Sequence, residues 1–140
     1  AARTEAEKQL AAAQEQAHAA WRDDAEAAVE AAGATIMGKG APRLPNTLFL
    51  SVPDWESPQA LIVLDLDGVM VSAGSACSSG KTKPSRAIVA MGRLDLATGG
   101  VRVSGGWGTT KDDWSRFSDA WTRAYARQRA RHTERAKENA

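Results

Sequence analysis

The first 32 residues contain no glycine or proline, and this uninterrupted stretch limits the possible folds more than any other feature. Fourteen of these residues are alanine, and Glu, Gln, Lys and Arg fill most of the other positions, so strong helix formers dominate. The sequence predicts one long helix over residues 3–32, ended by Gly33 in a left-handed conformation. Its narrow apolar stripe consists of Leu10, Ala13, Ala17, Trp21, Ala25 and Val29.

After Gly33 the sequence changes to short apolar segments separated by Gly and Pro. Segments of this length with such boundaries are typical of strands. In the last of them Val101 and Val103 alternate with Arg102 and Ser104, which predicts a strand with two distinct faces. The strands are predicted over residues 34–37, 47–52, 69–72 and 100–104.

Two short helices are predicted between these strands. Ser57 as N-cap, Pro58 in the first helical position and Gly68 after the end indicate a helix over residues 59–66. Pro84 opens the second helix, which covers residues 85–91 and is closed by Gly92.

The last helix is predicted to begin near Thr110. Asp112 and Asp113 fall in its first turn, where carboxylates stabilise the helix dipole. Aromatic residues follow at helical spacing and predict one buried stripe. The stripe consists of Trp114, Phe117, Trp121 and Tyr125.

The order of these elements predicts an α+β (α/β) fold in one domain over residues 1–140. A small mixed sheet of three to four strands is expected to be covered by helices, with one long helix at each end of the chain. We divide the domain into a long helix (1–33), a sheet-and-helix region (34–122) and a basic helical tail (123–140). The middle region includes a loop of very small residues, 72–80, that holds Cys77.

Composition excludes several classes of function. A net charge of +1 argues against a whole-surface footprint for nucleic acid or membrane. No apolar run approaches the roughly 20 residues of a membrane span, and no signal peptide is recognised, so we expect a cytoplasmic protein. The single cysteine excludes an internal disulfide, and with only His18 and His132 beside it we expect no metal site.

Two short motifs point to phosphate chemistry. Gly80-Lys81-Thr82 is like the end of a P-loop, but position 75 is Ser instead of Gly or Ala, and Pro84 follows where the P-loop helix should continue. Asp65-Leu66-Asp67-Gly68 resembles the signature of the haloacid dehalogenase superfamily, with Asp65 as nucleophile and Asp67 as general acid and base around Mg²⁺. That signature must follow a strand, whereas a helix is predicted here.

A third interpretation uses far more of the chain. The segment Val71-Ser72-Ala73-Gly74-Ser75-Ala76-Cys77-Ser78-Ser79-Gly80 resembles the active-site cysteine loop of the pyridoxal-phosphate-dependent cysteine desulfurases, which are class V aminotransferase-like enzymes. Four further segments resemble that family in the same order, over about residues 20–122. They are Arg43-Leu44-Pro45-Asn46-Thr47, Leu64 to Val69, Lys83 to Gly92, and Val101-Arg102-Val103-Ser104 with Gly106, Thr109 and Thr110.

The resemblance implies a role for Cys77 as nucleophile. In this family the corresponding cysteine takes sulfur from a cysteine substrate held on pyridoxal phosphate, releases alanine and carries the persulfide to an acceptor for iron–sulfur cluster or thio-cofactor synthesis. Ser72, Gly74, Ser75 and Ala76 would support the loop. On physical grounds a thiol among such small residues is accessible, and only its thiolate attacks, which Lys81 and Lys83 would favour. The alternative for a lone cysteine is a small buried side chain.

Arg102 is the second candidate. On its strand it points away from Val101 and Val103, and a guanidinium binds a carboxylate through two parallel hydrogen bonds. The family's matching arginine holds the substrate carboxylate; the alternative is an ordinary ion pair. The family usually carries a larger apolar residue at the position of Gly105, so we expect a looser strand end here.

The resemblance covers only the C-terminal small domain of such an enzyme. No lysine of this chain lies in the His-Lys context of the family's Schiff-base lysine, so we expect no cofactor-binding residue here and no activity of the chain alone. The expected partners are a large domain or chain that holds pyridoxal phosphate, a sulfur-acceptor or scaffold protein, and a second copy joined through the large domain. A non-catalytic interaction domain is the remaining alternative.

The tail is strongly basic. In the last 18 residues only Glu134 and Glu138 oppose the cations Arg123, Arg127, Arg129, Arg131, Arg135 and Lys137. Cations near a helix C-terminus are favourable in themselves, so this is either a solvated helix end or a docking surface for an acidic partner, such as a sulfur acceptor.

Overall fold

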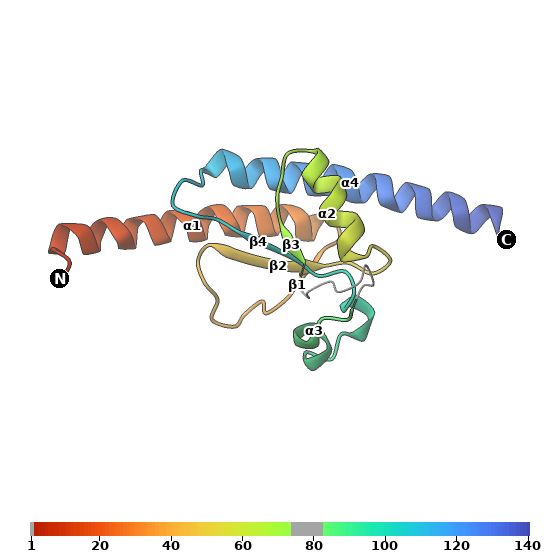
Figure 1. Ribbon diagram of the computed structural model, residues 1–140, viewed down its shortest axis with the longest axis horizontal. Coiled ribbons are helices and arrows are strands. Elements are labelled where there is room, and N and C mark those ends of the chain that lie inside the picture. The colour runs from red at the N-terminus through yellow and green to blue at the C-terminus, as the bar shows by residue number, and fades with distance from the viewer. Residues whose placement is uncertain (1, 74–82) are drawn as a thin grey trace.

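Two long helices, α1 (Glu5–Ala31) and α4 (Lys111–Glu138), lie side by side and run in the same direction, as Figure 1 shows. The structure is a computed structural model that describes residues 2–73 and 83–140. Each helix begins with a capping box, in which a threonine hydroxyl accepts a backbone N–H three residues on and the side chain there accepts the threonine N–H. The pairs are Thr4 with Glu7 and Thr110 with Asp113.

The α1 prediction is confirmed to within two residues at its start. Gly33 follows the helix with a φ of 118°, and a Cβ there would lie 3.1 Å from the Tyr125 ring. A side chain at position 33 would therefore be strained and would push on α4. The N-terminal half of α1 and the C-terminal half of α4 extend beyond the body of the molecule at opposite ends (Figure 1).

A four-stranded sheet packs against these helices. Its strands are β1 (Thr35–Ile36), β2 (Thr47–Ser51), β3 (Ser72–Ala73) and β4 (Val101–Ser104), in the order β1-β2-β4-β3. All three pairings are antiparallel, so the α+β class is confirmed but the expected mixed sheet is wrong. The helix α2 (Ser57–Leu66) connects β2 to β3 as a crossover, and those two strands are parallel. They do not pair because β4 lies between them.

The main core lies between the sheet and the helices α1, α2 and α4. Leu48 and Leu50 of β2 and Val101 and Val103 of β4 point into it, because alternate residues of a strand share a face. The predicted aromatic stripe of α4 is buried as a whole. Trp121 lies 4.9 Å from Tyr125 between ring centroids, and both rings contact Trp55 of the turn after β2.

A smaller core lies on the opposite face of the sheet. There α3 (Arg86–Ala90) and the 3₁₀ helix η1 (Leu94–Leu96) place Ile88 and Leu96 against Met37 and the half-buried ring of Phe49. The rest of this face carries no helix among the described residues (Figure 1).

Three local predictions need correction. Ser57 is the first residue of α2 instead of its N-cap, because its hydroxyl donates to the carbonyls of Thr98 and Gly100, 2.9 and 2.8 Å away; Glu56 is the N-cap. β3 begins at Ser72 instead of 69, because the Val69 N–H closes the end of α2 on the Leu64 carbonyl. Ser85 caps α3 through the Ile88 N–H instead of forming its first residue. The helix η1 was not predicted.

Candidate functional site on the open face of the sheet

Arg102 lies in the middle of the sheet on the face away from α1 and α4. Its neighbours Val101 and Val103 are buried, whereas Arg102 is exposed, which confirms the predicted two-faced strand. The pairing register places Phe49 of β2 on one side of Arg102 and Ser72 of β3 on the other. Directly opposed residues in antiparallel strands share one face, so these three side chains form a row across the open face.

The guanidinium of Arg102 lies over the Phe49 ring, 5.7 Å from the ring centroid. An aromatic face attracts a cation and holds its plane while leaving the N–H fork free. Within residues 2–73 and 83–140 no carboxylate pairs with Arg102. The arrangement therefore suits an anion that approaches from outside, and a carboxylate matches the fork with two hydrogen bonds.

The strand end beyond Arg102 is held tightly. The Asn46 side-chain amide donates to the Gly105 carbonyl (2.6 Å), and the Gly105 N–H donates to the Asn46 carbonyl (2.9 Å). A Cβ at Gly105 would lie 3.3 Å from both Thr109 and Trp114. The expectation of a looser strand at Gly105 is therefore wrong, because Thr109 and the Trp114 ring occupy the space of a larger side chain.

The predicted cysteine loop is described only at its start, residues 72 and 73. Cys77 and its neighbours Gly74, Ser75 and Ala76 lie outside the described residues, and so does the P-loop-like segment 80–82. Of the predicted loop-support residues, Ser72 is described, exposed and opposite Arg102. The structure therefore brings the start of the cysteine segment beside the predicted carboxylate-binding arginine.

The dehalogenase interpretation is wrong. Asp65 lies in the last turn of α2 and Asp67 is its C-cap, so the two carboxylates end a helix instead of following a strand. Asp67 lies 3.7 Å from a guanidinium nitrogen of Arg127, which gives it a structural partner. Within the described part of the chain no group of three or more His, Cys, Asp or Glu side chains has the arrangement of a metal site.

Four of the five described lysines are not placed to bind pyridoxal phosphate beside Arg102. Lys8, Lys111 and Lys137 lie on the two long helices, which pack against the face of the sheet opposite to Arg102. Lys39 is bound to both carboxylate oxygens of Glu30, at 2.6 and 2.8 Å. None of these four amines is placed to form a Schiff base beside Arg102.

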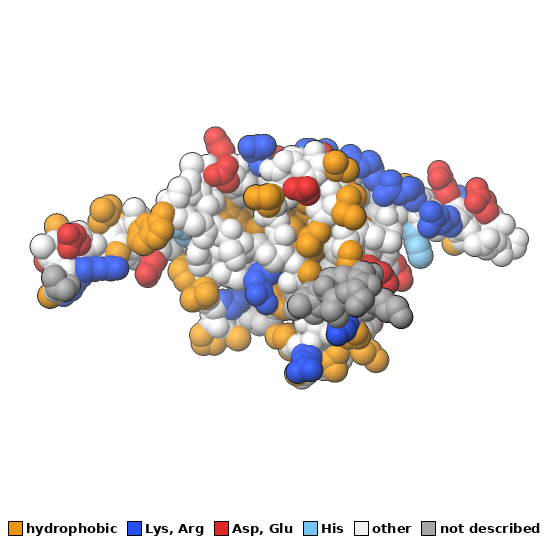
Figure 2. Space-filling view, in the orientation of Figure 1, with side chains coloured by type: hydrophobic (Ala, Val, Ile, Leu, Met, Phe, Trp, Pro, Cys, Tyr) orange, Lys and Arg blue, Asp and Glu red, His pale blue; other side chains and the backbone are white. Residues whose placement is uncertain are grey.

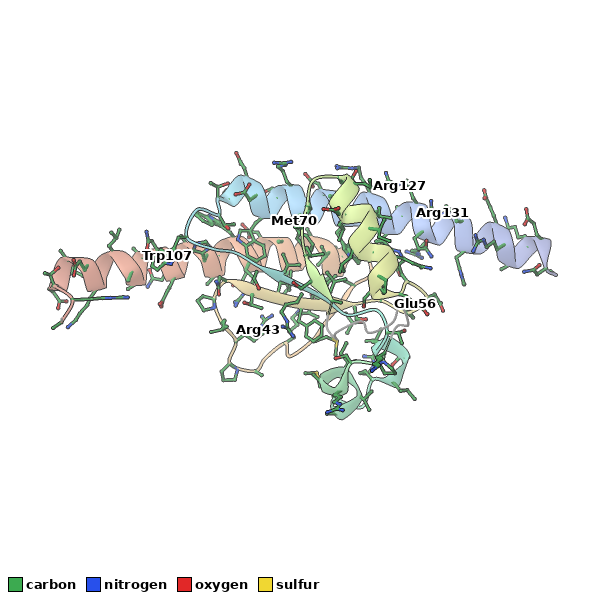
Figure 3. The ribbon with its side chains drawn as sticks, in the orientation of Figure 1. Arg43, Glu56, Met70, Trp107, Arg127 and Arg131 are labelled. Atoms are coloured by element: carbon green, nitrogen blue, oxygen red, sulfur yellow. The ribbon has the colours of Figure 1, made fainter. Side chains whose placement is uncertain are left out.

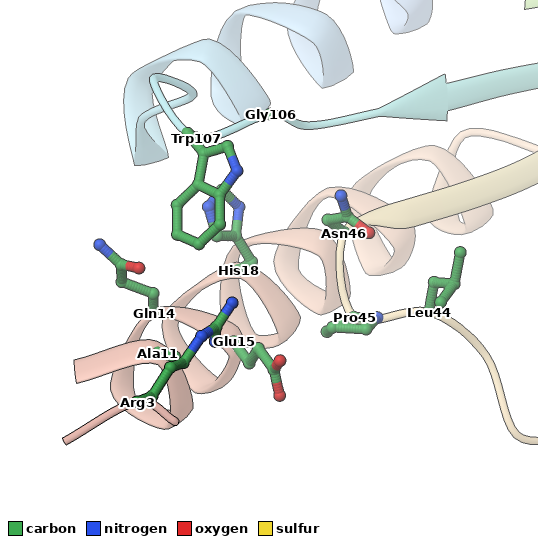
Figure 4. A pocket seen from close by; sticks show the side chains of 10 residues that line it. All are labelled: Arg3, Ala11, Gln14, Glu15, His18, Leu44, Pro45, Asn46, Gly106 and Trp107. Atoms are coloured by element: carbon green, nitrogen blue, oxygen red, sulfur yellow. The ribbon is translucent and has the colours of Figure 1, made fainter. Parts of the chain in front are cut away.

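One pocket was missed by the sequence analysis. It has a volume of about 340 Å³ and lies between the N-terminal half of α1 and the loop after β4 (Figure 4). Trp107 stands over it with 81% of its surface exposed, and His18 is half-buried with its Nδ1 atom unpaired among the described residues. The signal in the sequence was a tryptophan between two glycines, Gly106 and Gly108, where a loop displays it.

None of the helices formed by residues 2–73 and 83–140 has the length and apolar character needed to cross a bilayer.

No family model matches the chain. The chain is 42% identical over 79 residues to the cysteine desulfurase IscS of Dictyoglomus turgidum, an alignment that covers 56% of this chain and 20% of that protein. It is 39% identical over 71 residues to the putative cysteine desulfurase IscS 1 of Bacillus subtilis, covering 49% of this chain and 19% of that protein.

The fold has solved counterparts. The NifS-like protein of Rickettsia africae superposes with a TM-score of 0.67 at 23% identity, over 80% of this chain and 29% of that one. A second structure of a NifS-like protein gives 0.66 at 21% identity. The chain spans about a fifth of the length of the curated relatives it matches. This chain is therefore similar in sequence to one part of the cysteine desulfurases and in fold to one part of the NifS-like proteins.

Proposed function

We propose that this chain is the sulfur-accepting small domain of a cysteine desulfurase. Cys77 is the nucleophile that takes sulfur from cysteine and carries it as a persulfide. Arg102 binds the carboxylate of the cysteine substrate. The sequence similarity to cysteine desulfurases supports the class of reaction, and the geometry around Arg102 supports the division of roles.

The observation that carries the proposal is the pairing of Ser72 with Arg102. Ala73 ends β3, and Cys77 follows only four positions later in the chain. Because an extended chain covers at most about 3.6 Å per residue, Cys77 is tethered within about 14 Å of the end of β3. A carboxylate bound to Arg102 is thus held within the range that this thiol can reach.

The transfer step balances without an added oxidant. The Cys77 thiolate attacks the substrate sulfur, an S–S bond forms, and the Cβ–S bond of the substrate breaks. The electron pair of that bond stays on the substrate Cβ, which takes a proton and becomes the methyl group of alanine. Only the thiolate is nucleophilic, so a cationic environment around position 77 favours the step. A bidentate guanidinium fixes the substrate's orientation for that attack.

Pyridoxal phosphate supplies the electron sink for such a reaction when it is bound. Lys8, Lys39, Lys111 and Lys137 are not placed to hold it beside Arg102, and no lysine of this chain has the His-Lys context of the family's Schiff-base lysine, so we assign the cofactor to a separate large domain or chain. The open sheet face would then contact that large domain. A homodimer would form through the large domain. The persulfide would pass to an acceptor or scaffold protein for iron–sulfur cluster or thio-cofactor synthesis, in the cytoplasm.

The test is a chimera in which this chain replaces the matching segment of the Dictyoglomus turgidum desulfurase. We expect the purified chimera to bind pyridoxal phosphate, to form alanine from cysteine and to gain one sulfur atom on the Cys77 peptide by mass spectrometry. Cys77→Ser should abolish the persulfide and leave cofactor binding intact. Arg102→Lys should raise KM for cysteine, because an ammonium cannot make the paired hydrogen bonds.

Arg93→Lys is the matched control for Arg102→Lys, since Arg93 is an exposed arginine whose side chain pairs with Asp95 within the described residues. If the chimera that carries the whole chain does not bind the cofactor, a second chimera is made. In it, only residues 71–80 and 101–104 of this chain replace their counterparts in the Dictyoglomus turgidum desulfurase. Alanine formation at an unchanged rate in Cys77→Ser would contradict the assignment. A cofactor-loaded chimera that forms no persulfide on Cys77 would favour a non-catalytic interaction domain instead.

A further inference from the structure

The helix α2 is apolar on its outer as well as its inner face. Ala60 and Leu64 are buried against the core, while Ile62 and Leu66, one turn apart on the other side, are 63% and 81% exposed. Met70, beyond the turn at Gly68, is 87% exposed. We call Ile62, Leu66 and Met70 the outer row. A helix that is apolar all round is ordinarily covered on every side, so the outer row lacks its cover among the described residues.

A row of arginines on α4 runs beside the outer row. Arg123, Arg127 and Arg131 are spaced four residues apart, so they share one side of the helix, and all three are exposed. We call them the arginine row. Figure 3 shows Arg127 and Arg131 on one side of α2 and Met70 on the other, and Figure 2 shows apolar side chains over α2 next to a line of cations along α4.

Contacts between the end of α2 and α4 place α2 beside the arginine row. Asp67 at the end of α2 lies 3.7 Å from Arg127, and a Cβ at Gly68 would lie 3.7 Å from the guanidinium of Arg116. Beside this junction is a pocket of about 180 Å³, walled by Val69, Met70, Trp114 and Phe117, with Arg116 and Asp113 also lining it. Its size suits a single apolar side chain.

The charges of the arginine row are poorly neutralised. Like charges four residues apart repel on a helix, which destabilises it. Within the described residues Arg127 alone of the three has an ion pair, with Asp67. Arg131 donates to Gln128, and neither Arg123 nor Arg131 has a carboxylate within 4.0 Å in the described part of the chain. The acids nearest in sequence, Asp119 and Glu134, have no carboxylate oxygen within 4.0 Å of a guanidinium nitrogen of the row in the described part of the chain.

We propose that the outer row and the arginine row together bind an amphipathic acidic helix of a partner protein. Its apolar face would cover Ile62 and Leu66 and insert one side chain beside Met70. Its carboxylates would meet Arg123 and Arg131. Nucleic acid would satisfy the arginines but leave the outer row exposed, whereas a helix with one apolar and one acidic face matches both. This surface is separate from the open sheet face of Arg102 and does not depend on the desulfurase proposal.

The experiment titrates the full chain into a fluorescein-labelled designed helix of about 18 residues, with leucines at i, i+3, i+4 and i+7 spacing and glutamates elsewhere. Fluorescence anisotropy reports binding. We expect saturation in the micromolar to millimolar range, weakened at least about tenfold by raising the salt from about 0.05 to 0.5 M. Two matched peptides are the controls: one has lysine for every glutamate, and the other has the same composition without helical periodicity.

Variants of the chain locate the site. Leu66→Ser and the double variant Arg123→Gln with Arg131→Gln should each weaken binding about tenfold or more. The matched controls lie on the opposite face of the sheet: Leu94→Ser, an exposed leucine of η1, and Arg86→Gln with Arg93→Gln. They should change the affinity less than about twofold. All these positions are exposed, and circular dichroism with a thermal melt verifies that each variant is folded.

The proposal is overturned by any of four results of the binding experiments. These are no saturable binding of the acidic helix, equal binding of the lysine helix, equal loss of affinity in the control variants, and tighter binding of duplex DNA or of vesicles containing phosphatidylglycerol. Sedimentation of the chain tests whether a second copy of the chain covers the outer row. A dimer that Leu66→Ser dissociates would show that a second copy covers the outer row, and would also overturn the proposal.

Discussion

Asn46 and Gly105 are joined by two hydrogen bonds that run in opposite directions across the start of β2 and the end of β4. The residues are 59 positions apart in the chain, and their pairing fixes the register that places Arg102 opposite Phe49. We expect Asn46→Ala to destabilise the protein by about 1–2 kcal/mol, because it removes a donor to a carbonyl. Urea unfolding measures this loss.

Asn46→Asp is a second variant that tests the hydrogen bonds between Asn46 and Gly105. It keeps the size of the side chain but turns a carboxylate oxygen toward the Gly105 carbonyl, so it should destabilise at least as much as Asn46→Ala near neutral pH. A midpoint for Asn46→Ala equal to that of the unchanged protein would show that the 2.6 Å contact contributes nothing.

Gly99 lies where the backbone after η1 passes close to the end of β2. A Cβ at this position would come within 2.5 Å of the Val52 carbonyl and 2.9 Å of the Trp55 carbonyl, and neither backbone atom can move away. Gly99→Ala should therefore destabilise by about 2–3 kcal/mol in a thermal or urea melt. The control is Gly106→Ala, where no heavy atom lies within 4 Å of the added methyl group. Equal unfolding midpoints for Gly99→Ala and Gly106→Ala would refute the close approach of the backbone at Gly99.

Substitutions at Ser57 test whether its hydroxyl acts as a buried hydrogen-bond donor or as a helix cap. Its hydroxyl has the carbonyls of Thr98 and Gly100 as acceptors, and the residue is buried. Ser57→Asp should therefore destabilise by more than Ser57→Ala, for which we expect about 1–2 kcal/mol. A helix cap would show the opposite order, because Asp is among the best N-cap residues and Ala among the poorest. The order of the two midpoints in urea decides between the roles.

Asp113 makes the start of α4 sensitive to acid. It accepts the Thr110 N–H at 2.9 Å, and this hydrogen bond lowers the pKa of the Asp113 carboxyl. In the unfolded chain the pKa is about 3.9, so the stabilisation is present above that pH and is lost as the pH falls through the lower, folded value. Asp113→Asn should lower Tm at neutral pH and reduce the fall in Tm on acidification.

Asp112→Asn is the control for Asp113→Asn. It removes the same charge from the same first turn but takes no part in the capping box. The two variants share any change in the helix dipole interaction, so the difference between their Tm–pH curves isolates the hydrogen bond to Thr110. Superimposable curves would count against the capping contribution.

The four α-helices were predictable from the sequence because their signals are local. The spacing of Trp114, Phe117 and Trp121 and the threonine before Asp113 both lie within a few residues of the feature they predict. Ser57 was misassigned because Ser-Pro before an apolar run looks the same whether the serine caps the helix or donates to a distant carbonyl. Only the fold brings Thr98 and Gly100 to it.

The candidate site was predictable only in part. Strand alternation was enough to place Arg102 on the face away from the core, and the structure confirms that orientation. Its neighbours Phe49 and Ser72 depend on strand register, which is set by contacts remote in sequence. The prediction of a mixed sheet was wrong for the same reason, because no local sequence signal shows that β4 inserts between β2 and β3.

The position of β4 has a consequence for synthesis of the protein on the ribosome. β2 and β3 are made first, but each needs β4 as its neighbour, and β4 begins only at Val101. Until that residue emerges, β2 has a partner on one edge alone and β3 has none within the described sheet. Messages truncated before residue 101 should therefore give chains with unpaired strand edges, which are prone to aggregation and dependent on chaperones.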